Sequence, residues 1–195
     1  MMKILYMNQG VNGGWGAIKY SSYDIVCLAE SDQSKQGFEL AWKSTDSDPV
    51  MSIQQKEGTR TIINAKDLDK ICQSVRPMMT FTIKGSPVRV VFVHLKSGNQ
   101  KLADDALQIA ISELQIQAQT MSNRPVLWIG DFNRATPSAL NQAFSDAKCI
   151  HAGGGHSKWD LDRVYISGPW KEKPAVDVVS ISSADHGHQG LAVSL

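Results

Sequence analysis

The sequence predicts one α/β (α+β) domain, spanning residues 1–195, in which strands outnumber helices. The 195-residue chain is 42% hydrophobic and 20% charged, which is enough apolar material for a core and excludes an intrinsically disordered chain. Short runs rich in Val, Ile, Thr and aromatic residues recur between Gly, Pro, Asp or Ser, a pattern typical of strands. A single strong helical pattern interrupts them, and no repeat or low-complexity tract is visible.

The expected strands follow the chain from its first residues to its last. Several are apolar almost throughout, which favours strands covered on both faces. The expected ranges are Lys3–Met7, Asp24–Ala29, Val50–Gln54, Thr61–Asn64, Met79–Ile83, Val88–His94, Val126–Gly130, Arg163–Ile166, Val176–Ile181 and Gly190–Leu195.

The clearest helix is expected over Leu102–Met121, where apolar residues recur every three or four positions and form one stripe. Shorter helices are expected over Trp15–Tyr20, Leu68–Cys72 and Pro137–Phe144. The polar stretches Gln33–Asp48 and Gly153–Lys158 are expected to be irregular, the second containing a flexible glycine turn.

The overall charge excludes a protein that binds nucleic acid through a global basic field. Lys and Arg number 20 and Asp and Glu 19, so the formal net charge is +1. The three cysteines lack the spacing of a zinc ribbon or a disulfide framework. No apolar run has the length of a signal peptide or a membrane span, so we expect a cytoplasmic protein, with secretion or delivery to another cell left open.

Polar residues gather where expected strands end, which is where a rigid sheet presents groups to a ligand. His94 closes an apolar strand and is followed by Lys96 and a glycine turn, a pattern that suits phosphate binding or, alternatively, a capping histidine beside a solvated lysine. Asp131 and Asn133 follow the buried strand Val126–Gly130. A carboxylate there is costly unless it is paired or ligates a cation, although a simple Asx-turn is the other interpretation.

Two further motifs lie near the C-terminus. Asp162 and Val164 share one strand face and Arg163 lies on the other, so the motif is either part of a site or a salt bridge on an edge strand. Asp185 and His186 precede the last strand and form either site residues with different tasks or a surface turn. His188 has no motif context of its own.

Taken in chain order, these residues resemble the endonuclease/exonuclease/phosphatase superfamily, which includes DNase I, abasic-site endonucleases and inositol polyphosphate 5-phosphatases. The form of the motifs is most similar to bacterial nucleases of the superfamily, including the active subunit of cytolethal distending toxins. The resemblance implies a DNase I-like, four-layered sandwich of two packed mixed β-sheets flanked by helices. Its matching positions are Asn8, Glu30, His94, Gly130-Asp131-Phe132-Asn133, Asp162 and Asp185-His186.

The resemblance also implies a metal site. Glu30 is the expected main ligand of Mg²⁺ or Mn²⁺, supported by Asp185 and Asn8, because hard oxygen ligands suit these cations. His186, oriented by Asp162, would act as general base or phosphate contact, and Asp131 would position or deprotonate the attacking water. Which of the two is the base is left open.

The remaining implied roles concern the substrate. Asn133 would donate to the scissile phosphate, and His94 would stabilise the pentavalent phosphate or assist the leaving group. The expected backbone-phosphate contacts are Lys96, Arg134, Arg60 and Arg163. The superfamily has a serine where this chain has Ala184, which removes a hydroxyl beside the expected metal site.

The favoured function is that of a monomeric, divalent-metal-dependent DNA endonuclease of low sequence specificity, which contacts nucleic acid through its phosphate backbone. The alternative is a phosphatase acting on phosphoinositides or other phosphomonoesters, which near-neutral charge favours because long polyanions call for a broader basic surface. A non-catalytic binding module of the same fold is the third possibility. DNA and RNA, and endonucleolytic and exonucleolytic cutting, are not distinguished by the residues.

Overall fold

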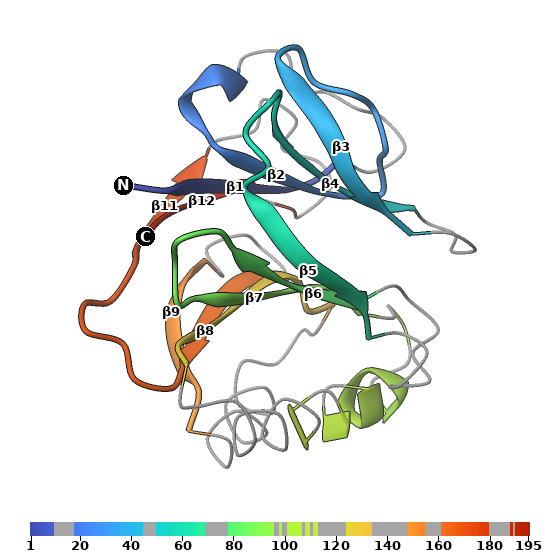
Figure 1. Ribbon diagram of the computed structural model, residues 1–195. Helices are drawn as coiled ribbons and strands as arrows, with labels where there is room; N and C mark the ends of the chain where they lie inside the picture. The colour runs from blue at the N-terminus through green and yellow to red at the C-terminus, as the bar shows by residue number, and fades with distance from the viewer. Residues whose placement is uncertain are drawn as a thin grey trace.

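Two six-stranded sheets lie face to face in the computed structural model (Figure 1). We call them sheet A, which holds the first strand, and sheet B. The structure describes residues 1–9, 18–44, 50–68, 78–95, 98, 101–106, 108–109, 111–112, 124–133, 148–154, 161–179, 188 and 190–195.

Each sheet combines strands from distant parts of the chain. Sheet A has the order β11 (Ala175–Val179), β12 (Gly190–Ser194), β1 (Lys3–Asn8), β2 (Ile25–Ala29), β4 (Met51–Lys56) and β3 (Phe38–Lys43). Sheet B has the order β5 (Ile62–Asp67), β6 (Met78–Ile83), β7 (Arg89–His94), β8 (Val126–Asp131), β10 (Asp162–Ser167) and β9 (Ile150–Gly154).

The main core fills the space between the two sheets. Alternate residues of the central strands, such as Tyr6 and Ile25 of sheet A and Phe92 and Ile129 of sheet B, point into it and are fully buried. This arrangement confirms the predicted sandwich of two packed mixed sheets.

The outer faces of the sheets carry smaller apolar clusters. Helical residues in the segment 101–112 pack on the outer face of sheet B through Ala103, Ala106 and Ile111. On sheet A, Tyr20 of the short 3-10 helix η1 (Tyr20–Ser22) covers part of the outer face. Among the described residues, no helix has the length and apolar character needed to cross a membrane.

The direction of the central strands decides where functional groups can meet. Within the described strand pairs, β1 and β2 run parallel in sheet A and β7 and β8 run parallel in sheet B, whereas the other neighbours are antiparallel. Parallel neighbours bring their carboxyl ends to the same edge of a sheet, which is where open α/β sheets bind ligands. Each sheet therefore presents one pair of strand ends at one edge.

The predicted strands are confirmed, with ends shifted by a few residues, but two strands were not predicted. β3 lies inside the stretch Gln33–Asp48 and β9 includes Gly153 and Gly154, both expected to be irregular. Both are edge strands and both pair through a register shift. An edge strand that is partly exposed and bulged lacks the continuous apolar run by which the central strands are recognised.

The helix predictions are confirmed only in part. The described residues of 101–112 are helical, as expected for the first half of Leu102–Met121, while the second half lies outside the described residues. Leu68 is not helical, because its backbone N–H donates to the Met78 carbonyl and prolongs the pairing of β5 with β6. Of the Trp15–Tyr20 prediction, Ile18 and Lys19 are not helical and Tyr20 begins η1 instead. Pro137–Phe144 lies outside the described residues.

Gly130 is required by the close approach of β7 and β8. Its φ is 149°, and a Cβ added there would lie 1.9 Å from the carbonyl oxygen of Val93 on the neighbouring strand. The glycine thus lets Asp131, the next residue, reach the edge of the sheet beside His94, its partner in the pairing of the two strands.

We expect Gly130→Ala to destabilise the fold by at least about 2 kcal/mol more than Gly58→Ala. Gly58 also has a positive φ, of 74°, but a Cβ added there meets nothing within 4 Å. Gly58→Ala therefore measures the cost of the backbone strain without a steric clash. Urea denaturation of the two variants and the parent measures the difference. Equal losses in the free energy of unfolding for the two variants would contradict the close contact between β7 and β8 at Gly130.

Candidate active site

The carboxyl ends of the two parallel strand pairs meet at one end of the sandwich. Asn8 and Glu30 lie at the ends of β1 and β2, and His94 and Asp131 at the ends of β7 and β8. Asp162 joins them because β10 runs antiparallel to β8, so its first residue pairs with the last residue of β8. Residues far apart in sequence therefore converge on one site.

Asp131 and Asp162 form a buried pair of carboxylates. They are direct partners across β8 and β10, and each is 1% exposed. Burial, and then the negative charge of Asp162, raise the pKa of Asp131 to about 8. The Asn8 side-chain amide donates to Asp131 Oδ2 at 3.0 Å and the Asn133 backbone N–H donates to Asp131 Oδ1 at 2.7 Å, which fixes the orientation of the group.

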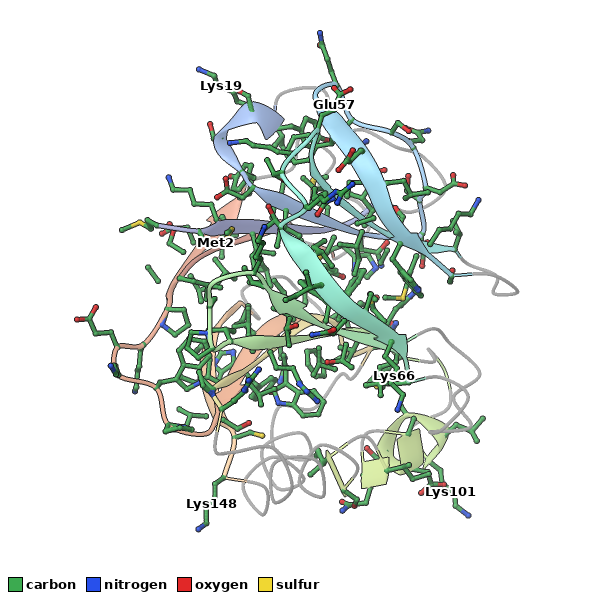
Figure 2. The ribbon with its side chains drawn as sticks, in the orientation of Figure 1. Met2, Lys19, Glu57, Lys66, Lys101 and Lys148 are labelled. Atoms are coloured by element: carbon green, nitrogen blue, oxygen red, sulfur yellow. The ribbon has the colours of Figure 1, made fainter. Side chains whose placement is uncertain are left out.

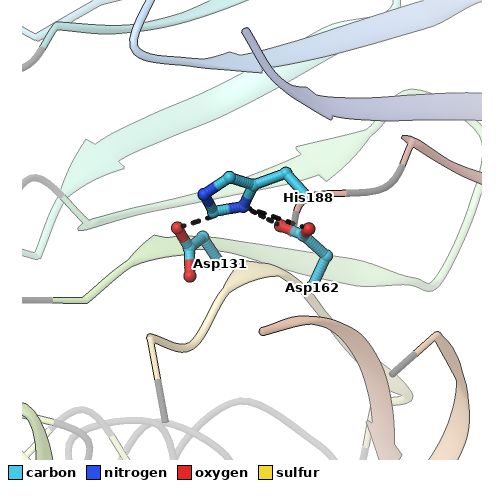
Figure 3. A group of neighbouring side chains, drawn as sticks. All are labelled: Asp131, Asp162 and His188. Atoms are coloured by element: carbon cyan, nitrogen blue, oxygen red, sulfur yellow. Dashed lines mark hydrogen bonds and ion pairs between the residues drawn. The ribbon is translucent and has the colours of Figure 1, made fainter. Parts of the chain in front are cut away.

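The His188 ring lies between the two carboxylates (Figure 3). Its Nδ1 is 3.2 Å from Asp162 Oδ2 and 3.7 Å from Asp131 Oδ2. Burial alone lowers the pKa of His188, but the hydrogen bond to Asp162 and the charges of Asp162, Asp131 and Glu30 outweigh it and raise the pKa to about 9. At neutral pH the ring is a cation that compensates part of the buried negative charge.

Tyr6 holds Asp162 from the other side. Its hydroxyl donates to Asp162 Oδ1 at 2.8 Å, and its ring packs edge-on against Phe92 in the core with the ring centres 5.8 Å apart. Burial and the neighbouring Asp162 and Asp131 charges raise the pKa of Tyr6 well above its ordinary value, so the hydroxyl keeps its proton. Asp162 is thereby fixed between a tyrosine donor and the His188 ring.

Glu30 and His94 form the more open part of the site. His94 Nε2 lies 3.5 Å from Glu30 Oε1 and 3.7 Å from Asp131 Oδ2. The Glu30 side chain is 26% exposed, whereas those of Asp131 and Asp162 are buried. Glu30 and Asn133 have φ of 59° and 46°, left-handed backbone that is uncommon outside glycine and gathers at functional sites.

The site offers ligands for a divalent cation. The ligand atoms of Asp131, Asp162 and His188 lie within 4.8 Å of one another. While His188 carries its proton it cannot coordinate a cation through that nitrogen, because a metal-ligating imidazole must be neutral. Glu30, the most exposed of the carboxylates, is then the one best placed to receive a cation from solvent, with hard oxygen chemistry that fits Mg²⁺ or Mn²⁺.

Of the expected site residues that the structure describes, most lie together. Asn8, Glu30, His94, Asp131 and Asp162 share one site. Asn133 lies beside them, with its side-chain amide donating to the Leu95 carbonyl at 2.8 Å, so it links the ends of β7 and β8. Its donation to a scissile phosphate remains a prediction. The other expected site residues Asp185, His186, Lys96 and Arg134 lie outside the described residues.

The structure places two expected phosphate contacts, Arg163 and Arg60, away from the site. Arg163 is 2% exposed and donates to the Tyr165 hydroxyl at 3.1 Å on the outer face of sheet B, because alternate residues of a strand point to opposite faces. Arg60 lies in the connection between β4 and β5, at the end of the sandwich where β2 begins, whereas Glu30 follows the end of β2. The five residues of β2 span about 17 Å, so Arg60 and Glu30 lie at opposite ends of the sandwich.

Among the described residues, His188 and Tyr6 belong to the site without having been predicted from sequence. His188 has no motif of its own, but β12 runs antiparallel to β1 with Leu191 opposite Tyr6, which brings His188, two residues before β12, close to the end of β1. Asn8 Nδ2 lies 3.5 Å from His188 Nε2. The sequence signal that could have identified His188 is its position two residues before the last expected strand, because the start of a strand constrains where the neighbouring residues lie.

Comparison with solved structures identifies the fold. The chain matches an endonuclease/exonuclease/phosphatase family protein from Bacteroides thetaiotaomicron with a TM-score of 0.69 and 12% identity, covering 98% of this chain and 93% of that one. It matches the mannosyl-6-phosphatase Bt3783 from Bacteroides thetaiotaomicron with a TM-score of 0.67 and 14% identity, covering 100% and 99%. It matches D. rerio TDP2 complexed with single strand DNA product with a TM-score of 0.63 and 11% identity, covering 98% and 97%.

No family model matches the sequence, and no curated protein matches it. The structural matches show that the chain has the DNase I-like fold of endonuclease/exonuclease/phosphatase proteins, as the motifs predicted. The narrower resemblance to cytolethal distending toxins stays a prediction.

The buried titrating groups predict a stability that falls at alkaline pH in the presence of a chelator. The pKa of Asp131 is raised from 3.8 to about 8, so the folded state loses stability as pH rises toward 8. The pKa of His188 is raised from 6.5 to about 9, so its contribution is complete below pH 6.5 and is lost as pH rises through 9. Both effects have the same sign between pH 6.5 and 8.

Asp162→Asn removes a charge that raises both pKa values, so we expect its free energy of unfolding to depend less on pH over this window than that of the parent. Urea denaturation at several pH values measures both slopes. Equal slopes would contradict the coupling of His188 and Asp131 to Asp162.

Proposed function

We propose that the chain is a divalent-metal-dependent phosphodiester hydrolase and acts as a DNA endonuclease of low sequence specificity. The observation that carries the proposal is the convergence of Glu30, Asp131 and Asp162 with His94 and His188 at one end of the sandwich. Carboxylates beside two imidazoles supply the cation ligands, proton acceptor and donors that phosphodiester hydrolysis requires. The structural match to TDP2 complexed with single strand DNA product supports DNA as the substrate.

Glu30 and Asn8 would hold Mg²⁺ or Mn²⁺, together with Asp185 as predicted from sequence. The bound cation would relieve the charge that develops on the phosphate oxygens. The acidic site repels a phosphate by itself, because Glu30, Asp131 and Asp162 contribute three carboxyl groups to one small volume.

Asp131 is the residue we assign to the attacking water. Its pKa of about 8 means that Asp131 holds a proton at neutral pH when no cation is bound. A cation held by Glu30 would favour the deprotonated form, which is a stronger base than an ordinary carboxylate, and the donors from Asn8 and Asn133 orient it. The protonated His188 is not the base, because an imidazolium cannot accept a proton. His188 instead donates to a phosphate oxygen, held in place by Asp162 and, through Asp162, by Tyr6.

His94 would contact the phosphate from the opposite side. Its Nε2 faces both Glu30 and Asp131, so a phosphate bound at Glu30 lies within reach of this ring. His94 thus stabilises the five-coordinate phosphate or assists the leaving oxygen.

A phosphatase acting on phosphoinositides or other phosphomonoesters is the second candidate. The structural match to a mannosyl-6-phosphatase favours it, and so does a formal net charge of only +1, because long polyanions are usually bound by broader basic surfaces. The same residues can serve either reaction, so the choice depends on the substrate.

We expect the purified protein to nick supercoiled plasmid in Mg²⁺ or Mn²⁺ and to stop when EDTA is added. His188→Ala and Asp131→Asn should each lower the rate by about 10²–10⁴-fold, the usual contribution of a group that transfers or donates a proton. His151→Ala is the matched control, because His151 is exposed on the edge strand β9 and should leave the rate unchanged.

His186→Ala separates the two histidines that precede the last strand. A large loss in His186→Ala with full activity in His188→Ala would assign the catalytic role to His186 instead of His188. Phosphate release from inositol phospholipid or mannose 6-phosphate without plasmid cleavage would favour the second candidate. A protein that cleaves none of these substrates in Mg²⁺ or Mn²⁺ would contradict the proposed chemistry.

A further inference from the structure

A pocket opens on the outer face of sheet B, away from the candidate active site. It has a volume of about 370 Å³. Among the described residues that line it, three are cations and none is a carboxylate, although the chain as a whole carries a formal net charge of only +1. We call it the basic pocket; it is lined by Asn64, Lys66, Thr80, Phe81, Thr82, Arg89 and Arg124.

Strand pairing places the three cations together. Lys66 of β5 is the partner of Thr80 in β6, and Thr82 of β6 is the partner of Arg89 in β7. Arg89 in turn pairs with Val126, so Arg124 lies just before the neighbouring strand β8. Lys66 lies at the end of β5 in Figure 2.

Arg89 and Arg124 line the same pocket. Burial, and then the positive charge of Arg124, lower the pKa of Arg89. Arg89 is half-buried and Arg124 is exposed, so an anion from solvent can reach both guanidinium groups and is attracted by both charges. The guanidinium groups also present planar sets of N–H donors that match phosphate oxygens.

The floor of the basic pocket is rigid and polar. The buried Thr80 hydroxyl donates to the Val90 carbonyl at 3.0 Å, and the Thr82 hydroxyl donates to the Ile63 carbonyl at 3.1 Å. A register shift between Ile63 and Lys66 places Asn64 in left-handed backbone, with φ of 53°, and its amide donates to the Thr82 hydroxyl at 3.1 Å. A bulge of this kind redirects side chains and is common beside binding sites.

We propose that the basic pocket binds the phosphate group of a small organic phosphate, of about the size of a mononucleotide. The three cationic side chains match the double negative charge of a phosphate group better than the single negative charge of a carboxylate ligand. The volume of about 370 Å³ falls within the range of small-molecule sites and leaves room for an organic group beside the phosphate.

The basic pocket is independent of the proposed hydrolytic site. Arg89 and His94 are the first and last residues of β7, so the strand holds them about 17 Å apart along its length. Arg89 lies on the outer face of sheet B with Val91 and Val93, whereas His94 points between the sheets toward Glu30. A ligand in one site therefore does not contact the other.

The test is isothermal titration calorimetry in EDTA, which prevents turnover, with adenosine monophosphate, inorganic phosphate and a short single-stranded DNA as separate probes. We expect adenosine monophosphate to bind one site and to lose at least tenfold in affinity in Arg89→Gln with Arg124→Gln, and severalfold in Lys66→Met. Arg60→Gln, an exposed arginine at a turn, is the matched control and should bind like the parent. His188→Ala should also bind like the parent.

Lys66 is exposed, so Lys66→Met keeps the test informative if the double variant fails to fold. Binding of adenosine monophosphate that none of these basic-pocket substitutions weakens would overturn the proposal. So would weak binding of inorganic phosphate alone, equal in all variants, which would mean an adventitious ion only. Binding of the DNA without binding of the mononucleotide would overturn the small-ligand assignment. Inorganic phosphate that competes with adenosine monophosphate supports recognition through the phosphate.

Discussion

The buried pair of carboxylates formed by Asp131 and Asp162 is the interaction on which the candidate site depends. Strand pairing sets them directly opposite one another in the interior, where two negative charges side by side are costly. The neighbouring groups reduce this cost. Tyr6 and Asn8 donate hydrogen bonds to the carboxylates, and the cationic His188 ring lies between them. The site is therefore organised before any substrate binds, which is the condition for efficient electrostatic catalysis.

The fold makes this arrangement possible through its two parallel strand pairs. An entirely antiparallel sheet would alternate the ends of neighbouring strands, so Asn8 and Glu30, or His94 and Asp131, would lie at opposite edges. The close contact of β7 and β8 at Gly130 and the left-handed backbone at Glu30 and Asn133 are local consequences of bringing these ends together. Strain of this kind persists where the surrounding structure holds it in place.

The sequence predicted the sandwich and much of the site because the signals are local. Asn8, Glu30, His94 and Asp131 each follow an apolar strand, and a polar residue after such a run is conspicuous. Edge strands β3 and β9 escaped prediction because they lack that run. The burial of Arg163 was not predicted because an alternating strand resembles an edge strand until its second neighbour is known, and here β9 pairs with β10 on the side away from β8.

The choice between His186 and His188 required the pairing of β12 with β1, which no local pattern encodes. Once that pairing is known, His188 is the ring that contacts Asp162. Its role as the compensating cation is the central claim, and an NMR titration of the histidine side chains in EDTA, assigned with His188→Gln, tests it most directly. We expect the His188 ring to hold protons on both nitrogens at pH 7 and to titrate with a pKa of about 9. A His188 pKa at or below the ordinary value of 6.5 would contradict the account.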